Sequence, residues 1–383
     1  MSKKIKICIV LIDRANYGRM LPLMKEIKKD KKINMQIICG GSMLFDKFGS
    51  TVNFVKKDGF TINEKIHMEL EGSTNISMSK SIGLGIIEFS NIFKKLNPNK
   101  VVIIGDRYEA LAAAIASVYM NKILVHLQGG EKSGSIDESA RHAITKLAHL
   151  HFPATKKAAE NIINMGENKK NVYNFGCPSI ELIKNIRVKT QDLDLANVGV
   201  GEEIDTNKKF LTVIYHPNTL KILEEKKNIK QLLLAVEKLK LPTYWLWPNI
   251  DAGSDVISKE IRKFRENKNP NWLKFIKHLD AITFQRILKK TSCAVGNSSS
   301  FIRDSGYHGT PVVLVGDRQN GREKGPNVLS SKINSDEIVK KIKFQLKKKK
   351  YKKNTIYGSG NTSKKIIKVL KSLNPDLQKK LDY

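Results

Sequence analysis

The stretch VVIIGDRYEALAAAIASVYMNKILVHLQGGEKSGSIDESARHAITKL, from Val101 to Leu147, decides the fold class of this chain. It holds two short β-branched apolar runs, Val101 to Gly105 and Ile123 to His126, and residues with helical spacing follow each of them. Runs this short are typical of buried strands rather than of buried helices. The stretch therefore predicts a β-α-β-α unit with parallel strands.

Polar residues cluster where these two predicted strands end. Asp106 and Arg107 follow the first strand, and the second is followed by Gln128, Glu131, Asp137 and His142. Ligands of open parallel sheets bind outside the carboxyl ends of the strands. We therefore expect a ligand site here, with carboxylates and a histidine as candidate catalytic groups.

The first half of the chain continues this alternation on both sides. Strands are expected at residues 5–12 and 35–40, helices at 17–29 and 76–96, and shorter elements at 152, 161–165 and 172–175. The turn after the first strand carries Arg14 and Asn16 and opens a helix, whose free N–H groups attract anions. No GxGxxG follows a strand, so a dinucleotide-binding fingerprint is not supported.

A second series of strands and helices follows a polar, glycine-containing segment at residues 187–209, which we interpret as a linker. Strands are expected at 210–217, 243–249, 272–277, 293–297 and 311–317, with helices between them and a lysine-rich helical tail after Asp336. The repeat predicts an α/β protein of two Rossmann-like, doubly wound domains, 1–186 and 210–383, facing each other across a cleft. Whether the C-terminal helices return to the first domain is left open.

The second half has polar strand ends of its own. The run Asn297-Ser298-Ser299-Ser300 lies between a strand and a helix, where small residues and free helix N–H groups favour a diphosphate cradle. The alternative is that a serine only caps the helix. Further candidate ligand contacts in this half are His216, Asn249, Asp251, Asp304, Arg318 and Arg322.

Composition limits the class of protein. The 383 residues carry a formal net charge of +31, with 57 lysines but only eleven arginines. Because the lysines are spread over helix faces without interleaved aromatics, we expect a solvated lysine surface and no nucleic-acid partner. The four cysteines form no CxxC pair, and no run approaches 18 apolar residues. These features predict a cytoplasmic protein without a structural metal or membrane span.

Several motifs together carry a family resemblance. They are GDRYEAL, HLQGGEKSGSIDESARHAITKLAHLHF, YHPNT, PNIDAGSD, GNSSSFIRDSGYHGTP and GDRQNGRE. In this order they resemble the hydrolysing UDP-N-acetylglucosamine 2-epimerases of sialic and legionaminic acid synthesis, from about Lys4 to Lys340. The resemblance implies a GT-B-like fold, a UDP-sugar held mainly by the C-terminal half, no cofactor or metal, and a homodimer or homotetramer.

The resemblance also implies a reaction. UDP leaves the sugar C1, the C2 proton is removed to give a 2-acetamidoglycal, and water then yields the free sugar inverted at C2. By this resemblance Asp106 and Asp137 match catalytic acids, His216 lies near the leaving diphosphate, and Asp304 replaces a glutamate that binds the ribose. Arg14, Arg318 and the serines at 299 and 300 are expected to balance the diphosphate charge.

Each carboxylate also has a purely structural alternative. Asp137 would make a good helix N-cap. Asp106 would suit Arg107 or a backbone N–H as its only partner. His149 is expected to pack in the core, while His142 is balanced between packing and ligand contact.

The sequence departs from the family at Gln128, where most members of the sialic acid pathway have the glutamate of HIEGGE. An amide is no general base. Either Glu131 or Asp137 replaces it, or the substrate is a relative of N-acetylglucosamine such as a 2,4-diacetamido-trideoxy sugar. The alternatives to hydrolysing epimerisation are a GT-B glycosyltransferase, a non-hydrolysing 2-epimerase and, suggested by charge alone, a nucleic-acid-binding protein.

Overall fold

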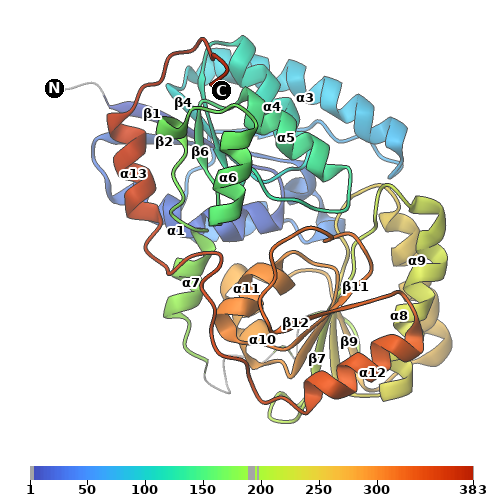
Figure 1. The fold of residues 1–383 in the computed structure, drawn as a ribbon. Helices are drawn as coiled ribbons and strands as arrows, with labels where there is room; N and C mark the ends of the chain where they lie inside the picture. The colour runs from blue at the N-terminus through green and yellow to red at the C-terminus, as the bar shows by residue number, and fades with distance from the viewer. Residues whose placement is uncertain (1–3, 189–194, 196–197, 383) are drawn as a thin grey trace. The chain divides into compact units, whose positions relative to one another are not determined.

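The structure is a computed structural model that describes residues 4–188, 195 and 198–382 (Figure 1). The chain forms two compact units. Unit 1 comprises residues up to Lys132, then 136–184 and 356–383, and unit 2 comprises 133–135 and 185–355. The last segment joins unit 1 because α13 (Ser363–Ser372) packs against α1 (Arg14–Lys29). The predicted linker contains residues 189–194 and 196–197, which lie outside the described residues.

Unit 1 is built on one parallel sheet of six strands in the order β3-β2-β1-β4-β5-β6, counted over the residues described. These strands are β1 (Ile5–Leu11), β2 (Ile33–Gly40), β3 (Glu64–Ile66), β4 (Lys100–Ile104), β5 (Ile123–Leu127) and β6 (Leu150–Phe152). Its other helices are α2 (Val52–Lys57), α3 (Asn75–Leu96), α4 (Tyr108–Tyr119), α5 (Asp137–Leu147), α6 (Lys156–Asn164) and α7 (Ser179–Asn185).

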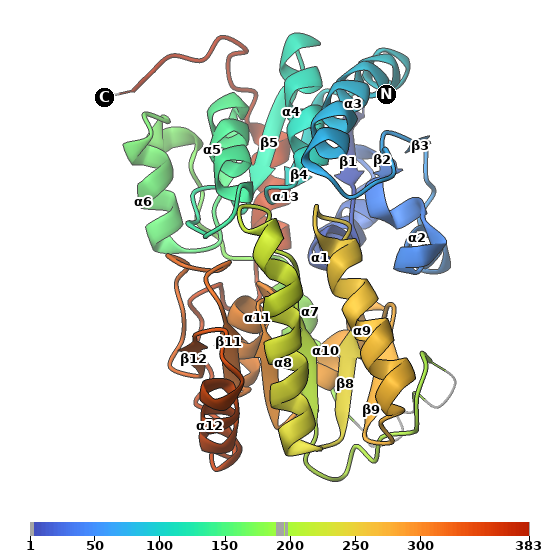
Figure 2. The same cartoon turned by 90° about the vertical axis from the view of Figure 1, so that its right-hand side faces the viewer.

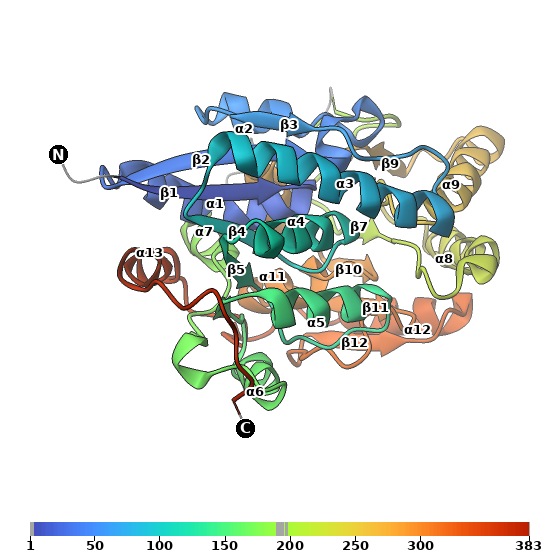
Figure 3. The ribbon, with the colours of Figure 1, turned by 90° about the horizontal axis from the view of Figure 1, so that it is seen from above.

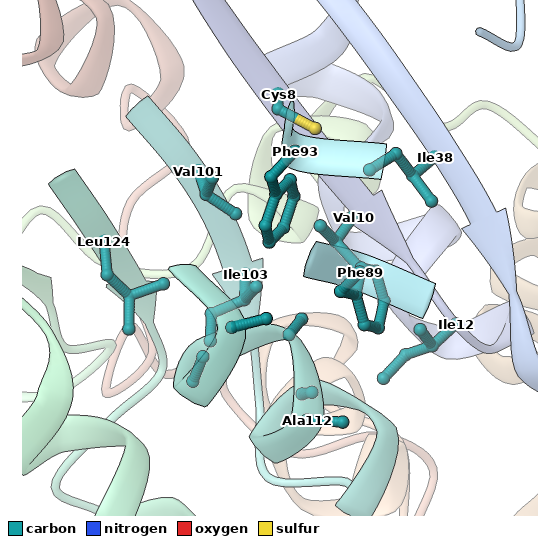
Figure 4. Close-up of a cluster of buried hydrophobic side chains, with 14 of the residues drawn as sticks. Cys8, Val10, Ile12, Ile38, Phe89, Phe93, Val101, Ile103, Ala112 and Leu124 are labelled. Atoms are coloured by element: carbon teal, nitrogen blue, oxygen red, sulfur yellow. The ribbon is translucent and has the colours of Figure 1, made fainter. Parts of the chain in front are cut away.

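The main core of unit 1 lies between this sheet and helices α3, α4 and α5. Figure 4 shows Phe89 and Phe93 of α3 over Val10, Val101 and other side chains of the central strands. The two rings stack with centroids 5.6 Å apart. Both are fully buried, and burying a side chain of this size stabilises the fold by about 1.5–3 kcal/mol.

Unit 2 repeats the architecture with a parallel sheet in the order β12-β11-β10-β7-β8-β9 (Figure 2). Its strands are β7 (Leu211–Ile214), β8 (Thr243–Leu246), β9 (Leu273–Ile276), β10 (Cys293–Gly296), β11 (Val312–Val315) and β12 (Val328–Ser331). Its helices are α8 (Glu225–Leu239), α9 (Ser254–Lys268), α10 (Ala281–Lys290), α11 (Ser300–His308) and α12 (Ser335–Leu346). Apolar residues of α8, α9 and α12 cover one face, around the buried Trp245.

Both sheets have the same strand order when numbered within their own unit, 3-2-1-4-5-6, which is that of the Rossmann fold. The order reverses between β1 and β4 in unit 1 and between β7 and β10 in unit 2. The prediction of two Rossmann-like, doubly wound domains is confirmed. Such a reversal, the switch point, opens a crevice at the carboxyl ends of the two strands.

Several predicted elements differ from the structure. The helix expected through the lysine-rich tail ends at Leu346, because Lys347 to Lys350 offer like charges and no apolar side chain to bury. Residues 172–175 form only an isolated bridge, between Val172 and His151. The sequence interpretation missed the short elements α2, β3 and β12. The last helix, α13, belongs to unit 1. No described helix is long and apolar enough to cross a membrane.

Candidate active site

The two strand ends at the switch point of unit 1 are occupied by charged side chains. Asp106 follows β4, and its Oδ2 accepts hydrogen bonds from Nε of Arg141, at 3.0 Å, and from Nη2 of the same guanidinium. Arg141 is 1% exposed, and its Nη1 also donates to the backbone oxygen of Glu131. Asp106 is therefore paired with an arginine 35 residues away in the sequence.

Arg107 contacts two carboxylates of unit 1, those of Glu109 and Asp13. Its Nη2 lies 2.8 Å from the fully buried carboxylate of Glu109, and its Nε lies 3.8 Å from Asp13. Asp13 caps α1 by accepting the backbone N–H of Asn16 at 2.5 Å. Burial lowers the pKa of the Arg14 guanidinium to about 10 although Asp13 opposes the shift, so Arg14 is cationic at neutral pH.

Gln128 directly follows β5 and is held within unit 1. Its Oε1 accepts from Nη1 of Arg19 at 3.3 Å, and its Nε2 donates to Sγ of Cys177 at 2.8 Å. The backbone has a φ of 64°, in the left-handed region, and its N–H donates to the carbonyl of Phe152 at 3.0 Å. The side chain is 1% exposed, so its amide is fixed in orientation by Arg19 and Cys177.

The acids after Gln128 occupy the loop and the helix that follow β5. Glu131 is 4% exposed, and Asp137 is the first residue of α5. The N-cap of α5 is Ile136, without a side-chain hydrogen bond, so Asp137 is not the capping residue. Nε2 of His142, one turn later, lies 3.4 Å from Oε1 of Glu138, while its Nδ1 is buried and has no hydrogen-bond partner among the described residues.

Two histidines, His126 and His149, have structural roles in unit 1, where they hydrogen-bond to neighbouring elements. His126 on β5 has Nε2 2.8 Å from the carbonyl of Gly105 and Nδ1 3.2 Å from Oγ1 of Thr145 on α5. Burial lowers the pKa of His126 to about 3, so the ring is neutral and donates to Gly105. His149 is 2% exposed and accepts the N–H of Leu124 at 3.0 Å, in agreement with a packing role.

At the switch point of unit 2, His216 and Asn297 join the ends of β7 and β10. The Asn297 amide accepts the N–H of His216 at 2.7 Å and donates to its carbonyl at 2.7 Å. Nδ1 of His216 lies 3.1 Å from the backbone N of Asn249. Because that N–H can only donate, Nδ1 is the acceptor, and a neutral His216 carries its proton on Nε2.

The serines after β10 form a tight turn into α11. Gly296 has a φ of 133°, and a Cβ there would lie 1.9 Å from the carbonyl oxygen of Ile214, so only glycine fits. Ser299 is the N-cap of α11 but makes no side-chain capping bond. Its Oγ accepts from Nη1 of Arg303 at 3.2 Å, and Oγ of Ser298 lies 3.4 Å from the N of Ser300. A backbone N–H at the start of α11 is thus bonded by Ser298, while Ser299, the N-cap residue, makes no capping bond.

Arg318 lies beside the same strand ends. Its Nε donates to the carbonyl of Pro217 at 3.1 Å, and its Nη2 lies 3.6 Å from Asp251.

Two further candidates of unit 2 are buried. Asp304 is 6% exposed and accepts a hydrogen bond from Nε2 of Gln285 at 2.7 Å, while Arg322 is 5% exposed. Unit 2 thus brings His216, Asn249, Asn297, Asp251 and Arg318 together, and Asp304 lies on α11 after the serines.

A small polar cavity of unit 2 adjoins Arg318 and Asn297 and is lined in part by Tyr215, Asn218 and Glu225. Glu225 begins α8 and is fully buried, and its Oε1 accepts the N–H of Asn218 at 2.7 Å. Burial raises the pKa of this carboxyl to about 7, although the Asn218 N–H opposes the shift.

Arg19, Gln285 and Asn218 were not among the candidate residues of either site. Arg141 and Arg303 were noted only as arginines in or beside the motifs, where a guanidinium suits phosphate or carboxylate. Arg19, Arg141 and Arg303 are three of only eleven arginines in a lysine-rich chain, and this scarcity was the available signal. Asn218 lies in the YHPNT motif, two residues after His216, whereas Gln285 belongs to no motif that would have revealed it. Their contacts depend on the packing of α10 against α11 and of β7 against its neighbours.

The two parallel sheets have Rossmann order, with acids at one switch point and a serine turn and an arginine at the other, so polar side chains lie where enzymes of this fold class bind their ligands. A family model described as UDP-N-acetylglucosamine 2-epimerase matches residues 25–371. The chain belongs to the UDP-N-acetylglucosamine 2-epimerase family, an enzyme family, and the resemblance seen in its motifs is confirmed.

Curated relatives match over nearly the whole chain. A UDP-N,N'-diacetylbacillosamine 2-epimerase (hydrolyzing) of Legionella pneumophila is 34% identical, covering 96% of each chain. A GDP/UDP-N,N'-diacetylbacillosamine 2-epimerase (hydrolyzing) of Campylobacter jejuni is 36% identical, covering 92% of this chain and 90% of the relative.

Solved structures share the fold. The Methanocaldococcus jannaschii UDP-GlcNAc 2-epimerase in complex with UDP-GlcNAc and UDP has a TM-score of 0.78 at 16% identity, covering 96% of this chain and 99% of that one. The Neisseria meningitidis UDP-GlcNAc 2-epimerase bound to UDP-GlcNAc has a TM-score of 0.77 at 16% identity, with 96% and 100% covered. The predicted GT-B-like fold class is thereby confirmed.

Proposed function

We propose that this enzyme is a hydrolysing 2-epimerase that converts a UDP-activated N-acetylhexosamine into UDP and the free sugar inverted at C2. The substrate is UDP-N-acetylglucosamine or a 2,4-diacetamido-trideoxy relative, and the product serves nonulosonic acid synthesis. One observation carries the proposal. Side chains that the sequence named as candidates lie at the switch point of each Rossmann sheet, where ligands of this fold bind: Asp106 in unit 1, and His216 with Asn297 in unit 2.

The names of the relatives support the choice among substrates. The two relatives named above, each more than 30% identical to this chain, are described as hydrolysing 2-epimerases of a diacetamido sugar nucleotide. Gln128 agrees with this choice, because a neutral amide stands where the sialic acid pathway has a carboxylate. We therefore place the diacetamido sugar first and UDP-N-acetylglucosamine second.

Groups of unit 2 suit the leaving diphosphate. The serine turn at 298–300 precedes the N-terminus of α11, and helix N-termini attract phosphate oxygens. Arg318 adds positive charge, and neutral His216 offers a proton on Nε2 because its Nδ1 accepts from Asn249. Donors held in place before the reaction stabilise charge that develops as the C1–O bond breaks.

Groups of unit 1 suit the proton transfers on the sugar. In the elimination, the C1–O electron pair leaves with UDP while a base removes the C2 proton, which gives the C1=C2 double bond of a 2-acetamidoglycal. Water then adds its oxygen to C1, and an acid returns a proton to the opposite face of C2. Asp106, Glu131 and Asp137 are the carboxylates that we assign to these steps.

The decisive experiment is NMR of each candidate UDP-sugar with the enzyme in deuterated water. We expect free sugar and UDP to form, with deuterium at C2 of the product. Protium retained at C2 would rule out the elimination route. No added metal or nicotinamide should be required, and assays with and without EDTA test that expectation.

The same assay separates the two other enzyme classes. A glycosyltransferase would release little UDP without an acceptor, and a non-hydrolysing epimerase would return a UDP-sugar inverted at C2 and no free sugar. We further expect the enzyme to work as a homodimer or homotetramer in the cytoplasm, without a nucleic-acid partner.

A further inference from the structure

The chain after α13 forms a strap across unit 1. The strap, defined here as residues 374–382, runs from the end of α13 to the neighbourhood of α6 (Figure 3). At one end, Oδ1 of Asn374 accepts a hydrogen bond from Nζ of the buried Lys100 at 2.6 Å. At the other end, the N–H of Asp382 donates to the carbonyl of Gly166 at 3.2 Å. The strap is therefore bonded to unit 1 at both of its ends.

The middle of the strap is bonded to residues beside β6. Nδ1 of His149 accepts the N–H of Leu124, so its Nε2 carries the proton and donates to the carbonyl of Leu377 at 3.2 Å. Nζ of Lys379 lies 2.7 Å from Oε2 of Glu167, which is 4% exposed. The ammonium of Lys379 is thus held against a buried carboxylate.

Glu167 is charged where the strap meets it. Burial alone would raise the pKa of this carboxyl, but hydrogen bonds from His151, Lys146 and Lys379 outweigh burial and lower the pKa to about 2. Nε2 of His151 lies 3.0 Å and Nζ of Lys146 2.7 Å from the carboxylate oxygens. A buried carboxylate that keeps its charge depends on such partners. Glu167 therefore fixes the position of the Lys379 ammonium.

Lys379 also closes the C-terminal end of α5. Its Nζ donates to the backbone oxygens of Lys146 and, at 3.5 Å, of Thr145, both in the last turn of that helix. Carbonyls of the last turn lack their usual partners within the helix, and the helix dipole favours a cation there. The ammonium therefore joins α5 to Glu167 and to the strap.

The N-terminal end of α5 carries the candidate chemistry. Asp137 is its first residue, and Arg141, one turn later, binds Asp106 and the backbone of Glu131. A helix of 11 residues is about 16 Å long, and a helix responds to a displaced end as a rigid element. A shift of the C-terminal turn is therefore transmitted to the acids.

A second connection runs through a buried histidine. Oγ1 of Thr145 lies 3.2 Å from Nδ1 of His126, whose Nε2 donates to the carbonyl of Gly105 at 2.8 Å. Gly105 directly precedes Asp106. The turn of α5 that Lys379 holds is thus bonded to the end of β4 as well.

We propose that Lys379 is a positioning residue for the proton transfers, and that the strap holds α5 in place through it. The inference rests on the proposed function, which assigns these transfers to acids that include Asp106 and Asp137. Catalytic groups act efficiently only when they are held in the productive geometry. Removing the ammonium should therefore lower kcat, whereas KM should stay, because Thr145, Lys146 and Glu167 are not among the residues proposed to bind substrate.

Steady-state kinetics of three variants form the first test. Lys379→Met removes the ammonium, and we expect kcat to fall about tenfold with KM within about twofold of wild type. Lys379→Arg keeps a charged donor and should retain about half of kcat or more. Lys380→Met is the matched control, because it removes the same charge from the exposed neighbouring residue, and it should keep wild-type kinetics. A wild-type kcat for Lys379→Met, or an equal loss in Lys380→Met, would overturn the proposal.

Chemical rescue separates positioning from misfolding. The four native cysteines are buried, so 2-bromoethylamine should alkylate the Lys379→Cys variant selectively at position 379. The product side chain has the length and charge of lysine. We expect kcat of the same sample to rise about fivefold or more on alkylation. Complete alkylation, confirmed by mass spectrometry, without a rise in kcat would contradict a positioning role.

Hydrogen exchange of the α5 amides gives a test that needs no substrate. We expect the last turn of α5 to exchange about tenfold faster in Lys379→Met than in Lys380→Met. Equal protection would mean that Lys379 does not hold the helix, and the proposal would fail. If the wild type forms no free sugar while α5 exchange still responds to Lys379→Met, the proposed function fails but the hold of the strap on α5 stands. The two failures are therefore distinguishable.

Discussion

The guanidinium of Arg141 binds the carboxylate of Asp106 through two nitrogens, with Nε 3.0 Å from Oδ2. The pair connects the end of β4 to α5, and the same guanidinium holds the backbone of Glu131. A single buried cation thus fixes both the first candidate acid and the loop that carries the second. Asp106 therefore has a structural role, as the partner of buried Arg141, in addition to its proposed role in proton transfer.

This double role changes the expected effect of Asp106→Asn. The variant should lower kcat by roughly 10² to 10⁴ if Asp106 transfers a proton. It should also lower the free energy of unfolding by about 1–3 kcal/mol, because Arg141 stays buried without its counter-charge. Steady-state kinetics and chemical denaturation measure the two effects.

Arg141→Lys is the matched control, since it keeps the positive charge and the carboxylate but loses the paired hydrogen bonds. We expect its kcat to exceed that of Asp106→Asn by at least tenfold at a similar stability. If both variants lose the same activity, Asp106 acts only by positioning.

Two substitutions distinguish the roles of the nitrogens of His216. Glutamine keeps an N–H donor near the position of Nε2, whereas asparagine keeps an acceptor near Nδ1 for the N–H of Asn249 and has no donor further out. If Nε2–H donates to the leaving diphosphate, His216→Gln should lose less than about tenfold in kcat and His216→Asn about 100-fold. The reverse order would show that the bond to Asn249 is the more important one.

Gln128→Glu tests the departure from the family. The new carboxylate would be nearly isosteric but would lie buried beside Arg19 and Cys177 and add negative charge near acids that must receive an anionic substrate. We expect lower turnover of the native substrate, and we expect Glu131→Gln to cost about tenfold or more.

Both variants should be assayed on UDP-N-acetylglucosamine and on the diacetamido sugar nucleotide. Faster turnover of UDP-N-acetylglucosamine by Gln128→Glu, together with a silent Glu131→Gln, would mean that Glu131 is not the replacement base. Gln128 would then be a substrate-selecting position.

Glu225 should make stability depend on pH. Its folded pKa of about 7 lies above the ordinary 4.5, so the folded state keeps a proton that the unfolded state releases. The stabilisation from this group is complete below about pH 4.5 and is lost as the pH rises through 7, amounting to about 3 kcal/mol.

Glu225→Gln keeps the acceptor for Asn218 and removes the titration. The Tm of the variant minus that of the wild type should therefore increase between pH 5 and pH 8. A difference that is constant with pH would mean that Glu225 titrates near its ordinary value.

The sequence by itself determined the architecture. Short β-branched runs alternating with helical spacing predicted two parallel sheets, because period and run length report local burial directly. The polar strand ends predicted where ligands bind, since every parallel strand delivers its carboxyl end to the same edge. The motifs around Asp106, Asp137 and Ser299 identified the family, which the match over residues 25–371 confirms.

The tertiary structure decided which polar and charged side chains contact each other. Asp106 pairs with Arg141, which is 35 residues away, and Gln128 contacts Arg19, which is 109 residues away. Short strands such as β3 and β12 also depend on what they pack against more than on their own pattern. Local periodicity depends on contacts within a few residues, whereas the partner of a strand-end charge depends on strand order and on the helix packed beside it. Strand order and helix packing are established only when the apolar faces of the sheet and its helices are buried against each other.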